Sequence, residues 1–132
     1  MIGYVTLGTN DLARSARFYD AVAAELGVGR VMERDGGIAW GTADGSGVVA
    51  MKPFDGNPAT VGNGVMIALN ARDEEQVRRV HEIALANGGR DEGAPGERDG
   101  GSYAAYFRDP DGNKLNAFCM PDTAGEAETS GG

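Results

Sequence analysis

The sequence has little of the chemistry on which many catalytic sites depend, since its 132 residues include one cysteine, one histidine and one tryptophan. The single cysteine, Cys119, excludes a disulfide within the chain and a zinc site built from several cysteines. The single histidine, His81, excludes a metal site to which one chain supplies several histidines. The sequence also has no phosphate-binding loop, no G-x-S-x-G turn and no H-E-x-x-H motif.

Positive charge and long apolar runs are scarce as well. Twelve Lys and Arg residues stand against 20 Asp and Glu residues, which gives a net charge of −8. Because nucleic acids and anionic membrane surfaces bind clustered basic residues, we expect neither as a partner. No apolar run approaches the roughly 20 residues of a membrane span. The N-terminal residues lack the basic and apolar regions of a signal peptide, so we expect a soluble, cytoplasmic protein.

The sequence is rich in apolar residues and in glycine. Its hydrophobic fraction of 41% is enough for a core, and its length is that of about one domain. The 22 glycines follow no collagen-like period and therefore mark turns and strand ends.

An internal repeat organises the chain. Aligned without a gap, YVTLGTNDLARSARFYD, which starts at Tyr4, falls on MIALNARDEEQVRRVHE, which starts at Met66. Each segment has a short apolar strand, an acidic helix start and an amphipathic helix that ends at glycine. The spacing predicts a first helix over residues 11–26, capped by Asn10 or Asp11, and a second over residues 73–87.

Strand-like segments separated by glycine-rich turns follow each helix. They lie near residues 30–33, 37–42, 47–53, 93–98, 102–108 and 114–120. We therefore predict an α+β fold of two tandem β-α-β-β-β modules, residues 1–56 and 64–120. Residues 57–63 form the linker, and residues 121–132 are predicted to be a flexible acidic tail.

The duplicated pattern resembles a known family. Together with the opening YVTLGTNDLARSARFYD, the linker PFDGNPATVGNG and the closing YAAYFRDPDGNKLNAFC, it is similar to the vicinal oxygen chelate superfamily of glyoxalases, bleomycin-resistance proteins and extradiol dioxygenases. The resemblance covers about residues 1–120. It implies curved mixed sheets around a pocket, and a homodimer in which the pocket is sometimes completed by the partner.

Strand alternation assigns residues to the pocket face of each sheet. Residues facing the helices are apolar, so their neighbours in the strand face the pocket. The residues assigned to the ligand-binding face in this way are Tyr4, Thr6, Met66, Tyr106, Asn116 and Phe118, and the resemblance adds Val49 in the last strand of the first module.

The resemblance implies where a metal would bind. Metal-binding members place histidine near the start of each module's first strand and glutamate in the last strand, which correspond to Tyr4, Met66 and Asn116 here. A fourth ligand, where present, corresponds to Val49. Because none of these four residues is a usual ligand for a divalent cation, we expect no metal and no cofactor.

Three other polar features have ordinary structural interpretations. His81 belongs to the second helix, on its partly buried face or toward solvent, and is interpreted as structural. Cys119 alternates away from the pocket and is expected to be a buried apolar residue. Asp109 and Asp111, in DPDGN, are interpreted as turn residues, because the spacing does not match a helix-loop-helix calcium loop.

Two functions remain open. The first is binding of a small molecule in a metal-free pocket, as the resemblance to bleomycin-resistance proteins implies, with Lys52, Arg108 or Lys114 at the rim attracting an anion or polar group. The alternative is a glyoxalase-type lyase or isomerase acting on a small carbonyl compound, with Tyr4 or Tyr106 as the acid. The sequence leaves open whether the protein is an enzyme.

Overall fold

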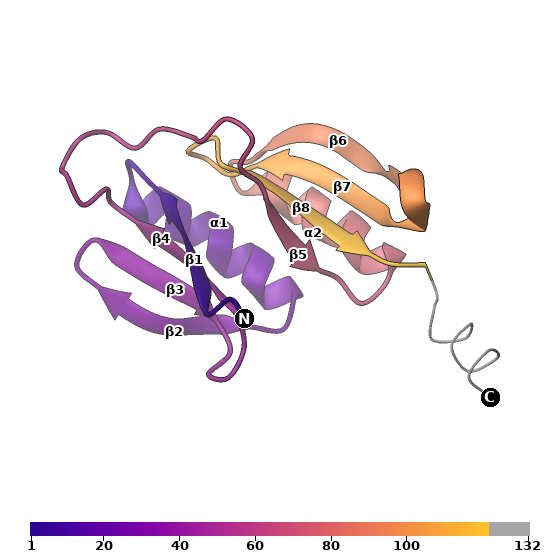
Figure 1. Ribbon diagram of the computed structural model, residues 1–132, viewed down its shortest axis with the longest axis horizontal. Helices are drawn as coiled ribbons and strands as arrows, with labels where there is room; N and C mark the ends of the chain where they lie inside the picture. The colour runs from indigo at the N-terminus through magenta and orange to yellow at the C-terminus, as the bar shows by residue number, and fades with distance from the viewer. Residues whose placement is uncertain (122–132) are drawn as a thin grey trace.

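A computed structural model describes residues 1–121 of the chain, and the predicted tail from residue 122 onward lies outside the described residues. The first half contains one helix and four strands (Figure 1). In chain order they are β1 (Tyr4–Gly8), α1 (Leu12–Glu25), β2 (Gly29–Arg34), β3 (Gly37–Gly41) and β4 (Gly47–Met51).

The second half repeats this order and adds a short 3-10 turn. Its elements are β5 (Ile67–Asn70), α2 (Glu74–Ala86), β6 (Arg90–Glu97), η1 (Asp99–Gly101), β7 (Tyr103–Arg108) and β8 (Lys114–Cys119). The predicted α+β fold of two β-α-β-β-β units is therefore confirmed.

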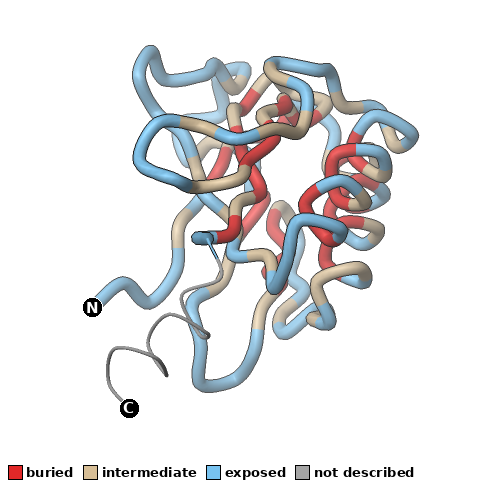
Figure 2. Tube along the Cα trace, turned by 90° about the vertical axis from the view of Figure 1, so that its right-hand side faces the viewer, coloured by how far each residue is buried: buried red, intermediate tan, exposed pale blue. Residues whose placement is uncertain are grey.

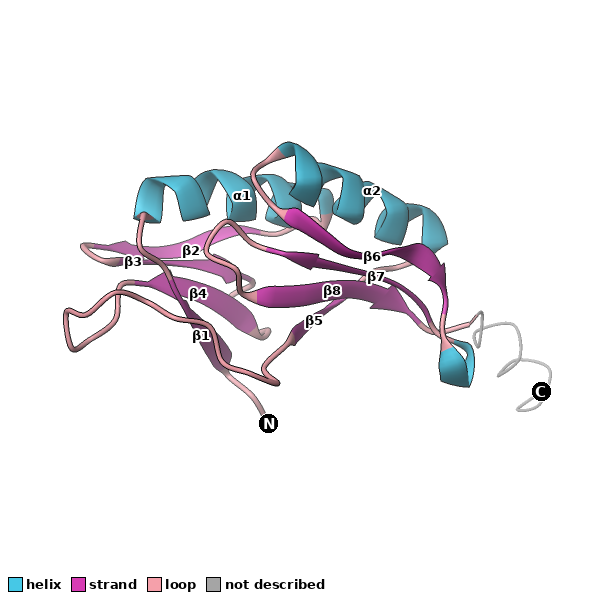
Figure 3. Cartoon of the chain, turned by 90° about the horizontal axis from the view of Figure 1, so that it is seen from above, coloured by secondary structure: helices cyan, strands magenta, loops and turns pink. Residues whose placement is uncertain are grey.

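Two four-stranded sheets have the same topology. Their strand orders are β1-β4-β3-β2 and β5-β8-β7-β6. In each sheet the first and last strands of the unit are parallel, and the other pairs are antiparallel. Both helices cover the same side of the sheets (Figure 3). The two sheets are curved and do not close into a barrel, so each keeps a free edge at β1 or β5.

Side-chain caps start both helices where the sequence predicts them. The Asp11 carboxylate accepts a hydrogen bond from the backbone N–H of Arg14, and Asp73 does the same for Gln76. The first helix ends before Gly27, whose φ of 79° lies in the left-handed region that glycine adopts without strain. Asp73 and Gln76 have the spacing of a capping box, in which the Gln76 side chain would accept from the backbone N–H of Asp73. The structure differs in one detail, because the Gln76 side chain accepts from the backbone N–H of Arg72 instead.

The core lies between the helices and the sheets, where the buried segments of Figure 2 face one another. Phe18 of α1 and Phe107 of β7 are fully buried, and their ring centroids are 6.2 Å apart. The core therefore continues from one unit into the other. Burial of each such side chain contributes roughly 1.5–3 kcal/mol.

The largest differences from the sequence prediction concern the start of β6 and the position of Met66. β6 begins at Arg90, whereas the sequence predicted a start at Gly93. Two register shifts in its pairing with β7 interrupt the alternation that would have revealed the earlier start. Met66 lies just before β5, which begins at Ile67. No helix within residues 1–121 is both long enough and apolar enough to cross a membrane.

Candidate functional site

The face of each sheet opposite the helices carries the side chains that the sequence assigned to a pocket. Alternate strand residues such as Ala50 and Leu115 belong to the helix-side core, so their neighbours project from the other side. We call that side the open face.

Asn116 occupies the centre of the open face of the second sheet. It pairs with Ala68 on β5 and with Tyr106 on β7, so its side chain lies between theirs. Asn116 is 6% exposed, and its Oδ1 atom is buried without a hydrogen-bond partner among residues 1–121. A buried acceptor without a donor costs about 1–3 kcal/mol, and such a group can be satisfied by a ligand or by water.

Val49 is the counterpart of Asn116 in the first sheet. It pairs with Thr6 on β1 and with Ala39 on β3, as Asn116 pairs with the equivalent strands of the second sheet. The alignment made from the sequence therefore chose the equivalent position. Val49 is buried but lies outside the helix-side core.

The remaining predicted residues are more accessible. Tyr4, at the start of β1, is 68% exposed, and Met66 is 40% exposed. Thr6 is exposed, while Tyr106 and Phe118 are half-buried. Phe118 pairs with Asn70 on β5 and therefore shares the open face with Asn116.

The side chains at the four positions that the family resemblance assigns to metal ligands do not fit a divalent cation. A phenol, a valine, a thioether and a neutral amide take the places of imidazoles and carboxylates at Tyr4, Val49, Met66 and Asn116. Within residues 1–121, no group of three or more His, Cys, Asp or Glu side chains is arranged to hold a metal ion.

Two cavities lie near the strands that carry the predicted residues. The first, of about 520 Å³, lies mainly on the helix side of the first sheet, between α1 and β5. Its walls include Val5, Tyr19, Trp40, Met66 and Ile67. It is mostly apolar, and Met66 is the one predicted ligand-binding residue in its wall.

The second cavity, of about 530 Å³, lies between the linker and the hairpin of β7 and β8. It is lined by residues 61–66, Arg108 and Lys114. Of the seven predicted residues, only Met66 lines it. The structure thus brings the predicted residues onto a shared face, but it does not enclose them in a single cavity.

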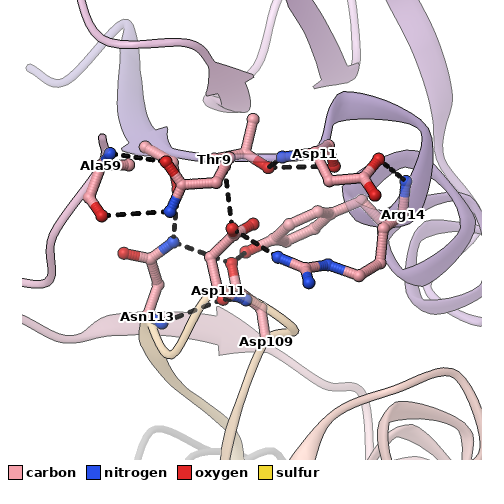
Figure 4. Close-up of polar contacts among 10 residues, drawn as sticks. Thr9, Asp11, Arg14, Ala59, Asp109, Asp111 and Asn113 are labelled. Atoms are coloured by element: carbon pink, nitrogen blue, oxygen red, sulfur yellow. Dashed lines mark hydrogen bonds and ion pairs between the residues drawn. The ribbon is translucent and has the colours of Figure 1, made fainter. Parts of the chain in front are cut away.

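A polar cluster around Asp109 joins the two units, and Figure 4 shows it. The Asp109 carboxylate accepts hydrogen bonds from the Tyr19 hydroxyl at 2.7 Å and from the Asn113 amide at 2.9 Å. It also accepts from the backbone N–H groups of Asp111 and Asn113. The turn interpretation of DPDGN is confirmed. The same turn also holds the two units together through these hydrogen bonds, and we call the polar cluster around Asp109 the clamp.

The clamp extends to β1, α1 and the linker. Asn113 donates to the backbone oxygen of Gly8, and Arg14 pairs with Asp111 at 2.7 Å. Asn10 accepts a hydrogen bond from the backbone N–H of Ala59. Sequence reasoning missed this cluster, because its long-range contacts join residues 49 to 105 positions apart and each residue fits an ordinary local role in a helix, cap or turn.

Burial raises the pKa of two side chains in the clamp, Asp109 and Tyr19. It raises the pKa of Asp109, although hydrogen bonds from Asn113 and Tyr19 act in the opposite direction. Burial also raises the pKa of the Tyr19 phenol well above its ordinary value, and the nearby Asp109 charge adds to this effect. Tyr19 is therefore a hydrogen-bond donor to Asp109 rather than a base.

His81 and Cys119 both have structural roles. His81 is buried against the helix-side core, with its ring 6.4 Å from that of Phe107, and its Nε2 lies 2.9 Å from Oδ1 of Asp91. Cys119 is buried in the core, as the alternation predicted. Burial raises the pKa of the Cys119 thiol, which disfavours the reactive thiolate.

Comparison with solved structures gives close matches over nearly the whole chain. A glyoxalase/bleomycin resistance protein from Albidiferax ferrireducens T118 is 38% identical, with a TM-score of 0.85, and the match covers 92% of this chain and 99% of that one. A glyoxalase-related enzyme from Fulvimarina pelagi is 26% identical, with a TM-score of 0.73 over 89% of this chain and 86% of that one.

A more distant match supports the fold alone. Lactoylglutathione lyase from Agrobacterium tumefaciens is 21% identical, with a TM-score of 0.66 over 89% of this chain and 92% of that one. No match was found among the curated proteins. The family described as Glyoxalase/Bleomycin resistance protein/Dioxygenase superfamily matches residues 1–117. Because that match spans both β-α-β-β-β units, the chain belongs to this superfamily.

Proposed function

We propose that the protein binds a small organic molecule on the open face without a metal ion. The observation that carries the proposal is the environment of Asn116, whose buried Oδ1 has no donor within residues 1–121. At this position a carboxylate would need a cation or a proton, whereas a neutral amide needs a hydrogen-bond donor. A ligand hydroxyl or N–H group meets that need.

The surroundings of Asn116 suit such a ligand. Tyr106 and Phe118 supply aromatic surface on the same face, and Met66 supplies a flexible apolar side chain. Small-molecule sites usually combine a mostly apolar lining with a few polar groups. A relative described as a glyoxalase/bleomycin resistance protein makes a binding role consistent with the family.

We further propose that two copies of the chain form a homodimer that covers part of the open face. Three apolar side chains on this face, Tyr4, Met51 and Met66, are each at least 37% exposed. Exposed apolar surface of this kind often marks an interface. The free edges of β1 and β5 also offer backbone groups to a partner.

A lyase or isomerase activity is the second candidate. The chain is similar in fold to a lactoylglutathione lyase, and Tyr4 and Tyr106 on the open face could donate a proton to a carbonyl substrate. The donor set at the metal positions argues against this candidate, since the polarising cation of such chemistry would have no usual ligands.

The binding proposal is tested by metal analysis and ligand titration on the same preparation. We expect less than stoichiometric zinc, nickel, manganese or iron, and we expect amide shifts in β5, β7 and β8 when small carbonyl and aromatic compounds are titrated in the presence of EDTA. Asn116→Ala should weaken binding, whereas Asn57→Ala, an exposed linker position, should not. Equimolar metal that is lost in Asn116→Ala would overturn the proposal and favour the enzyme.

A further inference from the structure

We propose that the open face of the second sheet holds the anionic group of its ligand in the positive field of Lys114 and Arg98, which both lie at the Tyr106 ring, so that the ligand is an organic acid. This inference rests on the proposed binding function and adds the chemical class of the ligand.

Two cations converge on one aromatic ring of the open face. The Arg98 guanidinium carbon and the Lys114 ammonium nitrogen each lie 5.4 Å from the centroid of the Tyr106 ring. Tyr106 pairs directly with Asn116 across β7 and β8. The ring at which the two positive charges lie is therefore a direct neighbour of the amide on which the binding proposal depends.

Arg98 is held in place by backbone contacts. Its Nη2 donates to the backbone oxygen of Ala94 at 2.7 Å, and its Nη1 donates to that of Glu97 at 3.3 Å. Two glycines of β6 leave the room it occupies, because a Cβ at Gly93 would lie 3.4 Å from Nη2 and one at Gly96 would lie 3.0 Å from Nη1. The guanidinium is thus positioned over the strand before any ligand arrives, and positioning of this kind lowers the cost of binding.

Neither cation has a carboxylate partner. Within residues 1–121, no Asp or Glu oxygen lies within 4.0 Å of the Arg98 or Lys114 nitrogens. Arg108, which shares the face and pairs with Lys114 in register, is by contrast bound to Glu92 at 3.1 Å. In a chain of net charge −8, two cations at one aromatic ring that have no carboxylate partner among the described residues form a local field that favours an anion.

The adjoining cavity has room for the rest of the ligand. It measures about 530 Å³, with Lys114 in one wall and Val61, Val65 and Met66 in another. Its apolar wall suits a hydrocarbon or aromatic body, while the ammonium suits a carboxylate. A cationic ligand would be repelled by both positive charges.

Three probes of the same shape and different charge test the inference: phenylacetate, 2-phenylacetamide and phenethylamine. Each is titrated into the full-length protein and followed by amide shifts in two-dimensional NMR. We expect phenylacetate to bind about tenfold more tightly than the neutral amide, with the largest shifts near Tyr106 and Lys114, and phenethylamine to bind most weakly.

Charge variants distinguish a local effect of Lys114 and Arg98 on phenylacetate binding from an effect of the protein's net charge. Lys114→Gln and Arg98→Gln should each weaken phenylacetate binding about five- to tenfold and leave the amide unchanged, whereas Lys114→Arg should retain most of the affinity. Arg17→Gln removes the same charge from the exposed side of α1 and should have no effect. Equal affinity for acid and amide, or equal loss in Arg17→Gln, would overturn this inference alone. Failure of all three probes to bind would overturn the binding proposal with it.

Discussion

The Tyr19 hydroxyl donates a 2.7 Å hydrogen bond to the Asp109 carboxylate, which joins the first helix to the last hairpin across 90 residues of sequence. Both groups are buried, and the contact connects the two β-α-β-β-β units at a point where their sheets are not hydrogen-bonded to each other. The relative position of the two open faces depends on such contacts.

Tyr19→Phe should therefore lower the free energy of unfolding by about 1–3 kcal/mol, because it removes a buried hydrogen bond and leaves Asp109 with one donor fewer. Urea unfolding measures the change. Tyr103→Phe is the matched control, since its hydroxyl accepts only an exposed contact from Arg78, and it should cost less than about 0.5 kcal/mol. Equal losses in the two variants would contradict the role of Tyr19.

The raised pKa of Asp109 predicts a definite pH dependence. Its folded pKa lies above the ordinary 3.8, so between the two values the folded chain binds the proton more tightly than the unfolded chain. The contribution of this group to stability is complete below pH 3.8 and is lost as the pH rises through the folded pKa. The stability of wild type minus that of Asp109→Asn should therefore fall with rising pH.

Asp20 provides a control in which the change of stability with pH has the opposite sign. The hydrogen bond from Arg30 lowers the pKa of Asp20, so its contribution is present above the ordinary pKa and is lost as the pH falls through the folded value. The stability of wild type minus that of Asp20→Asn should rise with pH. If the two differences change in the same direction, the assignment for Asp109 is wrong.

Asn116→Leu should leave the free energy of unfolding unchanged or raise it by up to about 1 kcal/mol, because it removes a buried acceptor that has no donor within residues 1–121. Asn113→Leu, which removes the hydrogen bonds to Asp109 and Gly8, should lower it by about 1–3 kcal/mol. Thermal and urea unfolding compare the two. A large loss in Asn116→Leu would mean that the side chain has a structural partner.

Close packing at Gly89 predicts a steric effect. A Cβ there would lie 2.6 Å from the backbone oxygen of Arg108 and 2.9 Å from the Phe18 ring, so Gly89→Ala should destabilise the protein by about 1–3 kcal/mol. Gly29→Ala, where a Cβ would have no heavy atom within 4 Å, should change stability by less than about 0.5 kcal/mol. A neutral Gly89→Ala would show that the helix end relaxes freely.

Dimerisation is tested by sedimentation velocity. We expect a dimer at protein concentrations on the order of 100 μM, because a partner would cover the exposed apolar side chains of the open face. Met51→Lys, which places a charge among them, should shift the population toward monomer. Monomer alone across the whole range would count against the homodimer.

The sequence by itself determined the local structure. Strand alternation, acidic caps such as Asp11 and Asp73, and the glycine after each helix follow from interactions between near neighbours, so the duplicated unit and the faces of its strands could be predicted. The residue types at Tyr4, Val49, Met66 and Asn116, the positions that the resemblance assigns to metal ligands, could also be read from the sequence, since they depend only on an aligned position.

The tertiary structure alone decided which distant groups meet. Three features depend on how the strands of one sheet lie beside each other and on how the two units dock. They are the hydrogen bond from the Tyr19 hydroxyl to Asp109, the absence of a donor to the Asn116 oxygen within residues 1–121, and the position of Arg98 at the Tyr106 ring. No local pattern encodes these contacts, because they arise from packing between segments whose separation in sequence is unrelated to their distance in space. The boundary of β6 was misplaced for a related reason, as the bulges opposite β7 interrupt the two-residue period on which strand prediction relies.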